Sequence, residues 1–416
     1  MTLNAKRRRA HDKLAALPGV RPVRRPVSPG SDEQFDLYYV RTGRKSAHPL
    51  VIIPGGPGVA SVQLYRSWRR RAVAKGLDVI MIEHRGVGLS RHTDAGTDLP
   101  PEAITVEQVV DDVAAVLDDA GVEKADVYGT SYGTYIAAGV GVRHPGRVRA
   151  MILDSPLLST HDIDAVRDAV RGLLLEGSDP QTAELAPKVR RLVDDGLIKD
   201  AGHVATMVYV YGGAALLDRQ LDLLLRGRTW LWSGLSRLGT MSSRKVPYRN
   251  ETDLVARIAF RELNYAGVPD GLPLDPAVAM REMTDITAPF ENEPYDLVAE
   301  MPKFGWPTVV VSGGRDLTTP PSVAERIASL IPGATLVRLP TAGHSVLDTR
   351  ERAAFAIIDA VRNDEIGNLP ALALELDTLP TRPGLRLLVS AISAAAAVES
   401  ALPAAVPRVV QRVTAS

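Results

Sequence analysis

The sequence predicts an α/β protein in which a mostly parallel central sheet carries helices on both faces and an inserted, mainly helical lid. Short aliphatic runs alternate with helical patterns toward both ends of the chain, and this alternation stops between residues 156 and 302. Alternating strands and helices are typical of parallel sheets, because a crossover helix must return the chain between neighbouring strands. The interruption is far too long for a connecting loop, so we expect it to fold as a lid.

Strands are predicted at short runs rich in aliphatic residues, namely Phe35–Val40, Leu50–Ile53, Asp78–Ile82, Ala125–Tyr128, Val148–Leu153, Thr308–Ser312 and Ala334–Leu339. Helices are predicted where apolar residues recur at helical spacing, namely Ile104–Leu117, Ile136–Val142, Ser322–Leu330 and Arg352–Val361. Thr105 followed by Gln108 resembles a capping box at the start of the first helix. We therefore expect a core made of residues 35–155 and 303–365, interrupted by the lid at 156–302.

The two ends of the chain carry weaker signals. Residues 1–34 begin with a cluster of lysine and arginine that His11 and Asp12 follow directly, which predicts a basic, mobile arm rather than an export signal. Residues 366–416 contain an apolar run that stops at Glu399 and is too short to span a bilayer. We expect this extension to be helical and to dock on the domain or on another subunit of a homo-oligomer, with attachment to a membrane surface or disorder as the alternatives.

Composition narrows the classes of function. Lys+Arg and Asp+Glu each number 49, so the overall charge gives no indication of a nucleic-acid partner. The chain has no cysteine, which excludes disulfides, thiolate metal sites and cysteine nucleophiles and fits a reducing compartment. We expect a cytoplasmic protein that needs neither a metal nor a cofactor.

The most informative motif is the pentapeptide Gly129-Thr130-Ser131-Tyr132-Gly133. An aliphatic run precedes it and a helical stretch rich in small residues follows it. This is the sequence form of a nucleophile elbow, a sharp strand-to-helix turn that presents a serine hydroxyl above the sheet. Because the pentapeptide alone is a weak signal, the assignment of Ser131 depends on partners elsewhere in the chain.

A serine hydroxyl needs a base that a third group orients. Of the eight histidines, only His344 follows a late predicted strand in a turn of small residues. In this arrangement the acid comes between serine and histidine along the chain, and Asp316 lies just past a predicted strand end. Asp154, at the end of an earlier strand, is the competing acid.

Acyl transfer also needs backbone amides that bind the oxyanion. One donor is expected from Tyr132, directly after the serine. The other is expected from the glycine loop after the run Leu50–Ile53, either Gly56 or its neighbour Gly55. The loop does not match a phosphate-binding motif, since it lacks the G-x-G-x-x-G spacing and the lysine of a P-loop.

The ordered motifs resemble those of the proline iminopeptidase and tripeptidyl aminopeptidase family of α/β-hydrolases, which are serine peptidases. They are Gly55-Gly56-Pro57-Gly58, Arg85-Gly86-Val87-Gly88-Leu89-Ser90, Gly129-Thr130-Ser131-Tyr132-Gly133, Asp316-Leu317-Thr318-Thr319-Pro320 and Gly343-His344. The resemblance covers roughly residues 35–363 and implies an α/β-hydrolase fold, the triad Ser131, Asp316 and His344, and a lid over the substrate cleft. Pro54 and Glu83-His84 depart from the family pattern, which has His and Asp-Gln there.

An aminopeptidase must bind a free ammonium, and a carboxylate in a partly dry cleft does so by charge-assisted hydrogen bonds. The segment around Glu262 resembles the glutamate-bearing lid segment of proline iminopeptidases, and Glu291 and Glu293 are further candidates. The first hypothesis is an aminopeptidase that releases N-terminal residues from short peptides. The second is an esterase or lactonase acting on a small metabolite. The third is a non-catalytic, hydrolase-like binding protein.

Overall fold

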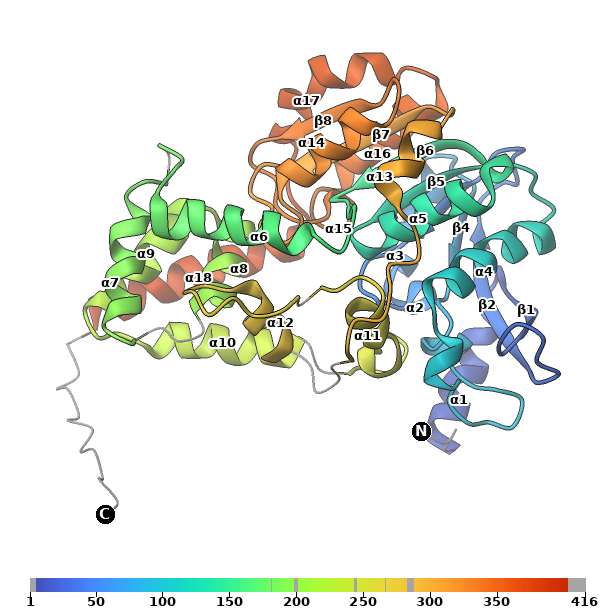
Figure 1. The fold of residues 1–416 in the computed structure, drawn as a ribbon, viewed down its shortest axis with the longest axis horizontal. Coiled ribbons are helices and arrows are strands. Elements are labelled where there is room, and N and C mark those ends of the chain that lie inside the picture. The colour runs from blue at the N-terminus through green and yellow to red at the C-terminus, as the bar shows by residue number, and fades with distance from the viewer. Residues whose placement is uncertain are drawn as a thin grey trace.

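The structure is a computed structural model that describes residues 5–180, 182–197, 201–242, 245–265, 267–282 and 288–402. Within these ranges, eight strands form one sheet in the order β1-β2-β4-β3-β5-β6-β7-β8 (Figure 1). Strands β1 and β2 run antiparallel to their neighbours, and all the others are parallel. The strands are β1 (Val20–Pro26), β2 (Gln34–Thr42), β3 (Leu50–Ile53), β4 (Val79–Ile82), β5 (Ala125–Thr130), β6 (Val148–Asp154), β7 (Thr308–Gly313) and β8 (Thr335–Leu339).

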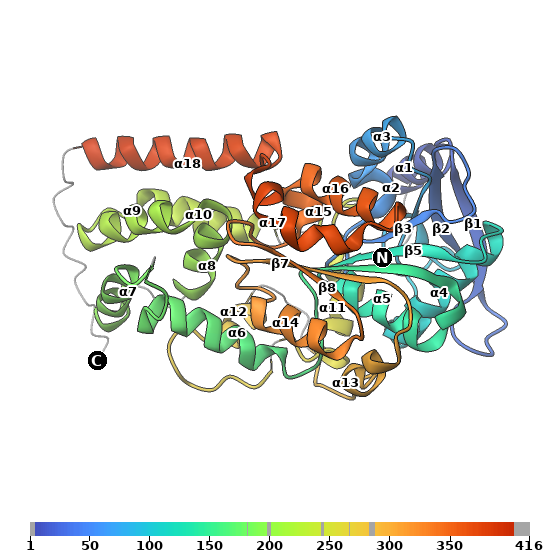
Figure 2. The ribbon, with the colours of Figure 1, turned by 90° about the horizontal axis from the view of Figure 1, so that it is seen from above.

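Helices cover both faces of this sheet, as the sequence predicts. One layer contains α4 (Val106–Asp119), α5 (Tyr132–Arg143) and α14 (Pro321–Leu330), and the other contains α3 (Arg66–Ala74), α16 (Glu351–Arg362) and α17 (Leu369–Thr378) (Figure 2). In β3, Val51 and Ile53 pack in the first layer and Leu50 and Ile52 in the second. A strand buried on both faces is aliphatic at every position, which is why β3 was visible in the sequence.

A helical lid separates β6 from β7 and has a hydrophobic cluster of its own. Its helices are α6 (Asp162–Arg171), α7 (Leu185–Asp194), α8 (Ala201–Gly212), α9 (Ala214–Leu225), α10 (Trp230–Ser242), α11 (Thr252–Arg261), α12 (Pro276–Glu282) and α13 (Leu297–Glu300). The lid therefore leaves the core at the carboxyl edge of the parallel strands, where loops that carry a site are also expected.

The segment 1–34 differs from the mobile arm that we predicted. It contains helix α1 (Ala5–Ala15) and strand β1, which pairs with β2 from Val20↔Val40 to Pro26↔Gln34. As an edge strand, β1 tolerates Pro22 and Pro26 and exposes arginines, so it lacks the alternation of a buried strand. The helix is held by contacts with residues far away in the sequence, which no local pattern could indicate.

The described part of the C-terminal extension, residues 366–402, is helical, with α17 packed on the sheet and a second helix packed on the lid. Helix α18 (Pro383–Ala401) runs alongside α9 and α10 (Figure 2). The Glu399 carboxylate accepts the amide hydrogens of Trp230 and Leu231, at 2.8 and 3.0 Å, where α10 begins. With 19 residues and a mean hydropathy of 1.4, α18 is longer than the apolar run that we considered and could cross a membrane by length and composition. The homo-oligomer that we expect through this tail stays a prediction.

We predict that Glu399→Ala lowers the free energy of unfolding by about 1 kcal/mol, because two amide groups at the start of α10, one of them buried, lose their acceptor. Urea denaturation measures the change. The control is Ser390→Ala, which alters an exposed position on the same helix. Equal midpoints for the two variants would show that α18 does not brace the lid.

Candidate active site

Ser131 occupies a sharp turn between β5 and α5. Its backbone has φ 52° and ψ −126°, and residues other than glycine seldom adopt such a positive φ. A Cβ atom added to Gly129 would lie 2.3 Å from the carbonyl oxygen of Gly133, and one added to Gly133 would lie 2.0 Å from that of Ile53. Only glycine fits at either position, because strand, helix and the neighbouring strand β3 approach so closely. The pentapeptide therefore has the geometry of a nucleophile elbow.

Asp316 and His344, predicted as acid and base, are brought into contact. They follow β7 and β8 respectively, and His344 Nδ1 lies 2.9 Å from Asp316 Oδ2. The Asp316 carboxylate is buried and also accepts the amide hydrogens of Thr318 and Thr319, at 2.9 and 3.0 Å. These amides fix the carboxylate in one orientation, so that it can hold the imidazole with Nδ1 as donor and leave Nε2 to act as base.

Charge sets the protonation of this pair. Burial alone would raise the pKa of Asp316, but the His344 ring and the hydrogen bonds to its carboxylate hold that pKa below its ordinary value. Burial would likewise lower the pKa of His344, yet the charge of Asp316 raises it above its ordinary value of 6.5. The carboxylate thus stabilises the imidazolium that would form when His344 accepts a proton.

Asp154, the competing acid, makes hydrogen bonds to two loops of the site. Its buried carboxylate accepts the amide hydrogens of Val346 and Leu347, at 3.0 and 2.8 Å, and its backbone oxygen accepts that of Ser131 at 2.9 Å. Burial raises the pKa of Asp154 to about 6. Asp154 therefore ties the serine turn to the loop that follows His344, whereas Asp316 is the carboxylate that contacts the imidazole.

Direct hydrogen bonds join the neighbours of Ser131 and His344. Thr130 Oγ1 donates to Ser345 Oγ at 2.9 Å, and the Ser345 amide donates to Ser155 Oγ at 2.9 Å. Across the described residues no hydrogen bond is found between Ser131 Oγ and the His344 ring. Catalytic contacts of this kind often tighten only when substrate is bound, so proton transfer between these two groups belongs to the proposal below.

The glycine loop lies against the serine turn. A Cβ atom on Gly55 would lie 3.0 Å from Ser131 Cβ and 3.6 Å from Ser131 Oγ, so Gly55 is the glycine that borders the hydroxyl. Gly56, with φ 123°, follows it in the loop. Either amide stays a candidate for the oxyanion, together with the amide of Tyr132 at the start of α5.

His84, noted above only as a departure from the family pattern, fixes the side chain of Tyr132. The Tyr132 hydroxyl lies 2.9 Å from His84 Nε2, and His84 Nδ1 lies 2.5 Å from the carbonyl oxygen of Arg85. Burial lowers the pKa of His84 to about 4, so the ring is neutral near pH 7. A neutral ring can donate from Nδ1 and accept the Tyr132 hydroxyl hydrogen at Nε2, which immobilises the residue after the serine.

A cavity of about 270 Å³ lies between the core and the lid, and Ser131 lines it. Most of its lining is apolar, including Leu157, Ile163, Val166, Leu263 and Met280. Polar groups on its wall include Ser159, Asp162, His203, Asn264 and Asp275. A mainly apolar chamber with a few polar groups is typical of a site for a small organic molecule.

None of the three lid glutamates predicted to bind an ammonium lines this cavity. Glu262 is buried and accepts the Val106 amide hydrogen at 2.8 Å, where α4 begins, and it also pairs with Arg261. Glu293 accepts the Thr160 amide at 3.1 Å, and Glu291 is more than half exposed. The structure thus gives these predictions no support, because Glu262 and Glu293 accept backbone amide hydrogens and Glu291 is largely exposed.

Asp162 is one of two acidic residues on the cavity wall, the other being Asp275, that the sequence analysis did not identify. Asp162 accepts the amide hydrogens of Leu158 and Ser159, at 2.7 and 3.2 Å, and burial raises its pKa to about 6. The available signal was its position shortly after the strand Val148–Leu153, at the start of a helix. Carboxyl ends of parallel strands are where sites form, and the segment that bears Asp162 follows such an end.

The chain belongs to the α/β-hydrolase fold family, whose sequence model matches residues 48–191 and 278–351. This confirms the predicted superfamily and fold. The 2-hydroxymuconate semialdehyde hydrolase of Pseudomonas sp. strain CF600 is 35% identical over 150 residues, which are 35% of this chain and 46% of that enzyme. The chain thus spans less than half the length of that curated relative.

Two other relatives match over nearly their whole length. A rhodomycin D methylesterase of Streptomyces sp. strain C5 is 28% identical over 78% of this chain and 94% of its own. A proline iminopeptidase of Neisseria gonorrhoeae is 23% identical over 80% of this chain and 93% of its own. Among solved structures, a proline iminopeptidase of Mycobacterium smegmatis has a TM-score of 0.48 at 17% identity, covering 83% of this chain and 99% of its own.

We predict that kcat/KM falls as the pH drops and that the midpoint of this acid limb lies above pH 6.5. The base must be neutral, and the pKa of His344 is raised above 6.5 chiefly by Asp316. Asp316→Asn should move the limb to lower pH and reduce kcat by about 10⁴-fold. Asp154→Asn is the matched comparison, and a larger shift in that variant would make Asp154 the acid.

Proposed function

We propose that the protein is a serine hydrolase that cleaves an ester of a small, largely apolar molecule through an acyl-enzyme. The observation that carries this proposal is the cavity beside Ser131, which is mainly apolar and from which the predicted ammonium-binding glutamates are absent. An apolar lining favours substrate groups that gain by leaving water, and it gives little to a charged peptide terminus.

The chemistry follows from the contact between Asp316 and His344. His344 Nε2 removes the hydroxyl proton of Ser131 as its Oγ attacks the carbonyl carbon of the ester. The oxyanion accepts hydrogen bonds from the Tyr132 amide and from an amide of the glycine loop. When the intermediate collapses, the protonated His344 gives its proton to the leaving alcohol. Water then repeats the sequence on the acyl-enzyme and releases the acid.

Aminopeptidase activity is the second candidate. A carboxylate at the cavity, Asp162, could bind an ammonium by charge-assisted hydrogen bonds. The similarity to a proline iminopeptidase over 93% of that enzyme also favours it. We rank it second because Asp162 already accepts two backbone amides and burial favours its neutral form.

We predict that Ser131→Ala lowers kcat on aryl esters by more than about 10³-fold while the protein stays folded. The substrates are p-nitrophenyl esters of increasing acyl length and aminoacyl arylamides, proline included. Wild-type enzyme should prefer the esters, with KM falling as the acyl chain grows. Ser329→Ala, at a serine outside the site, is the control. Undiminished turnover by Ser131→Ala would refute the proposal.

We predict that Asp162→Asn changes ester and arylamide turnover in parallel, because an ester has no ammonium that needs the charge. The asparagine oxygen can still accept the amide hydrogen of Leu158, whereas that of Ser159, which binds the other carboxylate oxygen, loses its acceptor. Thermal unfolding therefore has to show that the variant stays folded. A loss confined to the aminoacyl arylamides, of about tenfold or more in kcat/KM, would instead establish aminopeptidase recognition.

A further inference from the structure

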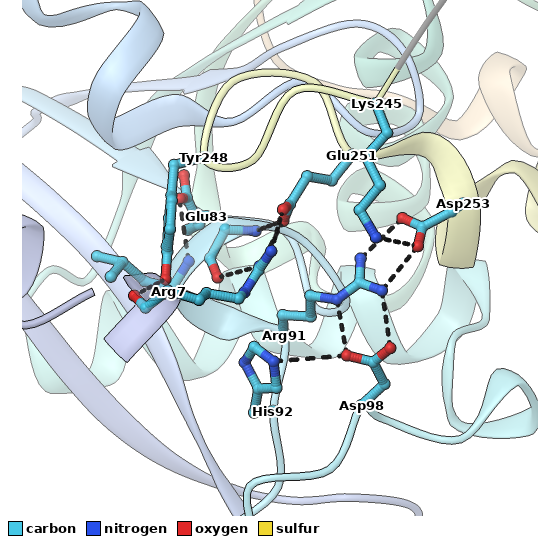
Figure 3. A network of polar contacts seen from close by, with 11 residues as sticks. Arg7, Glu83, Arg91, His92, Asp98, Lys245, Tyr248, Glu251 and Asp253 are labelled. Atoms are coloured by element: carbon cyan, nitrogen blue, oxygen red, sulfur yellow. Dashed lines mark hydrogen bonds and ion pairs between the residues drawn. The ribbon is translucent and has the colours of Figure 1, made fainter. Parts of the chain in front are cut away.

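A buried ion pair joins helix α1 to the base of the lid. Arg7 donates through both terminal nitrogens to Glu251, at 2.6 and 2.9 Å (Figure 3). The side chains are 5% and 0% exposed. The Arg7 guanidinium also lies over the ring of Tyr248. The Tyr248 hydroxyl donates a hydrogen bond to the backbone oxygen of Arg7 at 2.9 Å. Neither partner falls within the residues matched by the family model, so this pair is an addition to the common core.

The segment Val246–Glu251, which we call the lid base, is hydrogen-bonded to the glycine loop. The Glu251 amide donates to the carbonyl oxygen of Gly58 at 2.8 Å, and the Ala60 amide donates to that of Arg249 at 3.0 Å. Val59 and Asn250 form an antiparallel bridge between these contacts. The lid base therefore acts as a short strand along the loop that carries Gly55 and Gly56.

The Glu251 carboxylate extends this connection to a third segment. Its Oε2 accepts the Gly88 amide hydrogen at 2.6 Å, in the turn that follows β4. The same turn is tied to the start of α2 (Ser61–Leu64) by Glu83, which accepts the amides of Ser61 and Leu89 at 2.6 and 3.3 Å. Two buried carboxylates, Glu83 and Glu251, thus hold the glycine loop, the turn and the lid base together.

Arg7 supplies the positive charge that pairs with the buried Glu251 carboxylate. A buried carboxylate without a partner must take up a proton or move toward water. Either change would weaken the bond of Glu251 to the Gly88 amide and loosen the lid base against the glycine loop. Arg91, which pairs with Asp253 at 2.8 Å, lies farther along and does not contact Glu251 in Figure 3.

We propose that Arg7 is a positioning residue, which holds the glycine loop in its catalytic conformation by neutralising Glu251 beneath the lid base. This inference rests on the proposed function, in which an amide of that loop binds the oxyanion. Helix α1 is then part of the catalytic scaffold. A displaced oxyanion donor weakens binding of the transition state more than binding of the substrate. Loss of Arg7 should therefore lower kcat more than it changes KM.

The test compares Arg7→Met with Arg9→Met, an exposed arginine on the same helix. Steady-state kinetics on a p-nitrophenyl ester should show kcat reduced about 10- to 100-fold in Arg7→Met, with KM changed less than about threefold. Arg9→Met should match wild type. Thermal unfolding measures the folded fraction. An unchanged kcat, a loss equal to the unfolded fraction, or an equal loss in Arg9→Met would overturn the proposal.

A second variant separates charge from general damage. Glu251→Gln added to Arg7→Met removes the unpaired charge and keeps an acceptor for the Gly88 amide, so kcat should recover to within about threefold of wild type. If Arg7→Met does not fold, Arg7→Lys keeps the charge and loses the bidentate contact. It should lower kcat more than it changes KM, and a wild-type kcat in this variant would contradict the inference.

The Ser131→Ala variant distinguishes a failure of the proposed function from a failure of the positioning role of Arg7. If it is inactive and Arg7→Met is fully active, the hydrolase proposal stands and the positioning role falls. If Ser131→Ala keeps its activity on the ester, the proposed function falls and this inference falls with it.

Discussion

The buried carboxylate of Asp154 is the constraint on which the candidate site depends. Ser131 and His344 lie far apart in the sequence, on loops that follow different strands. The last residue of β6 lies between those strands and binds both loops, through its backbone oxygen to Ser131 and through its carboxylate to Val346 and Leu347. Charge-assisted bonds in a dry environment are strong and directional, so the two loops keep one relative arrangement.

Buried carboxylates that accept backbone amide hydrogens recur around the molecule. Asp316, Glu83, Glu251 and Glu262 are buried acids whose oxygens accept backbone amides at a turn or at the start of a helix. Each satisfies donors that would otherwise be buried without a partner, which is costly. The loops at the carboxyl edge of the sheet are thus fixed by acidic side chains reaching across from other segments, and only some of those acids can serve chemistry.

This explains which features the sequence could predict. The strand Leu50–Ile53 and the helix around Val109 can be predicted because the spacing of their apolar residues is a local property of the sequence. The acid Asp316 and the base His344 follow from strand order, because the carboxyl ends of parallel strands share one edge. Arg7 and Glu262 were misjudged because their partners are distant. Arg7 pairs with a residue 244 positions away, and a glutamate that caps another helix looks the same in sequence as one that binds substrate.

Two terminal helices, α1 and α18, contact the lid. Both lie outside the residues that the family model matches. Helix α1 reaches the lid base through Glu251, and α18 reaches the start of α10 through Glu399. The matched core residues supply the serine turn, whereas Leu263 and Met207, on the cavity wall, belong to the lid. The shape of the cavity therefore depends on a lid held from two sides. A change in either terminal helix can therefore alter the cavity without touching Ser131, Asp316 or His344.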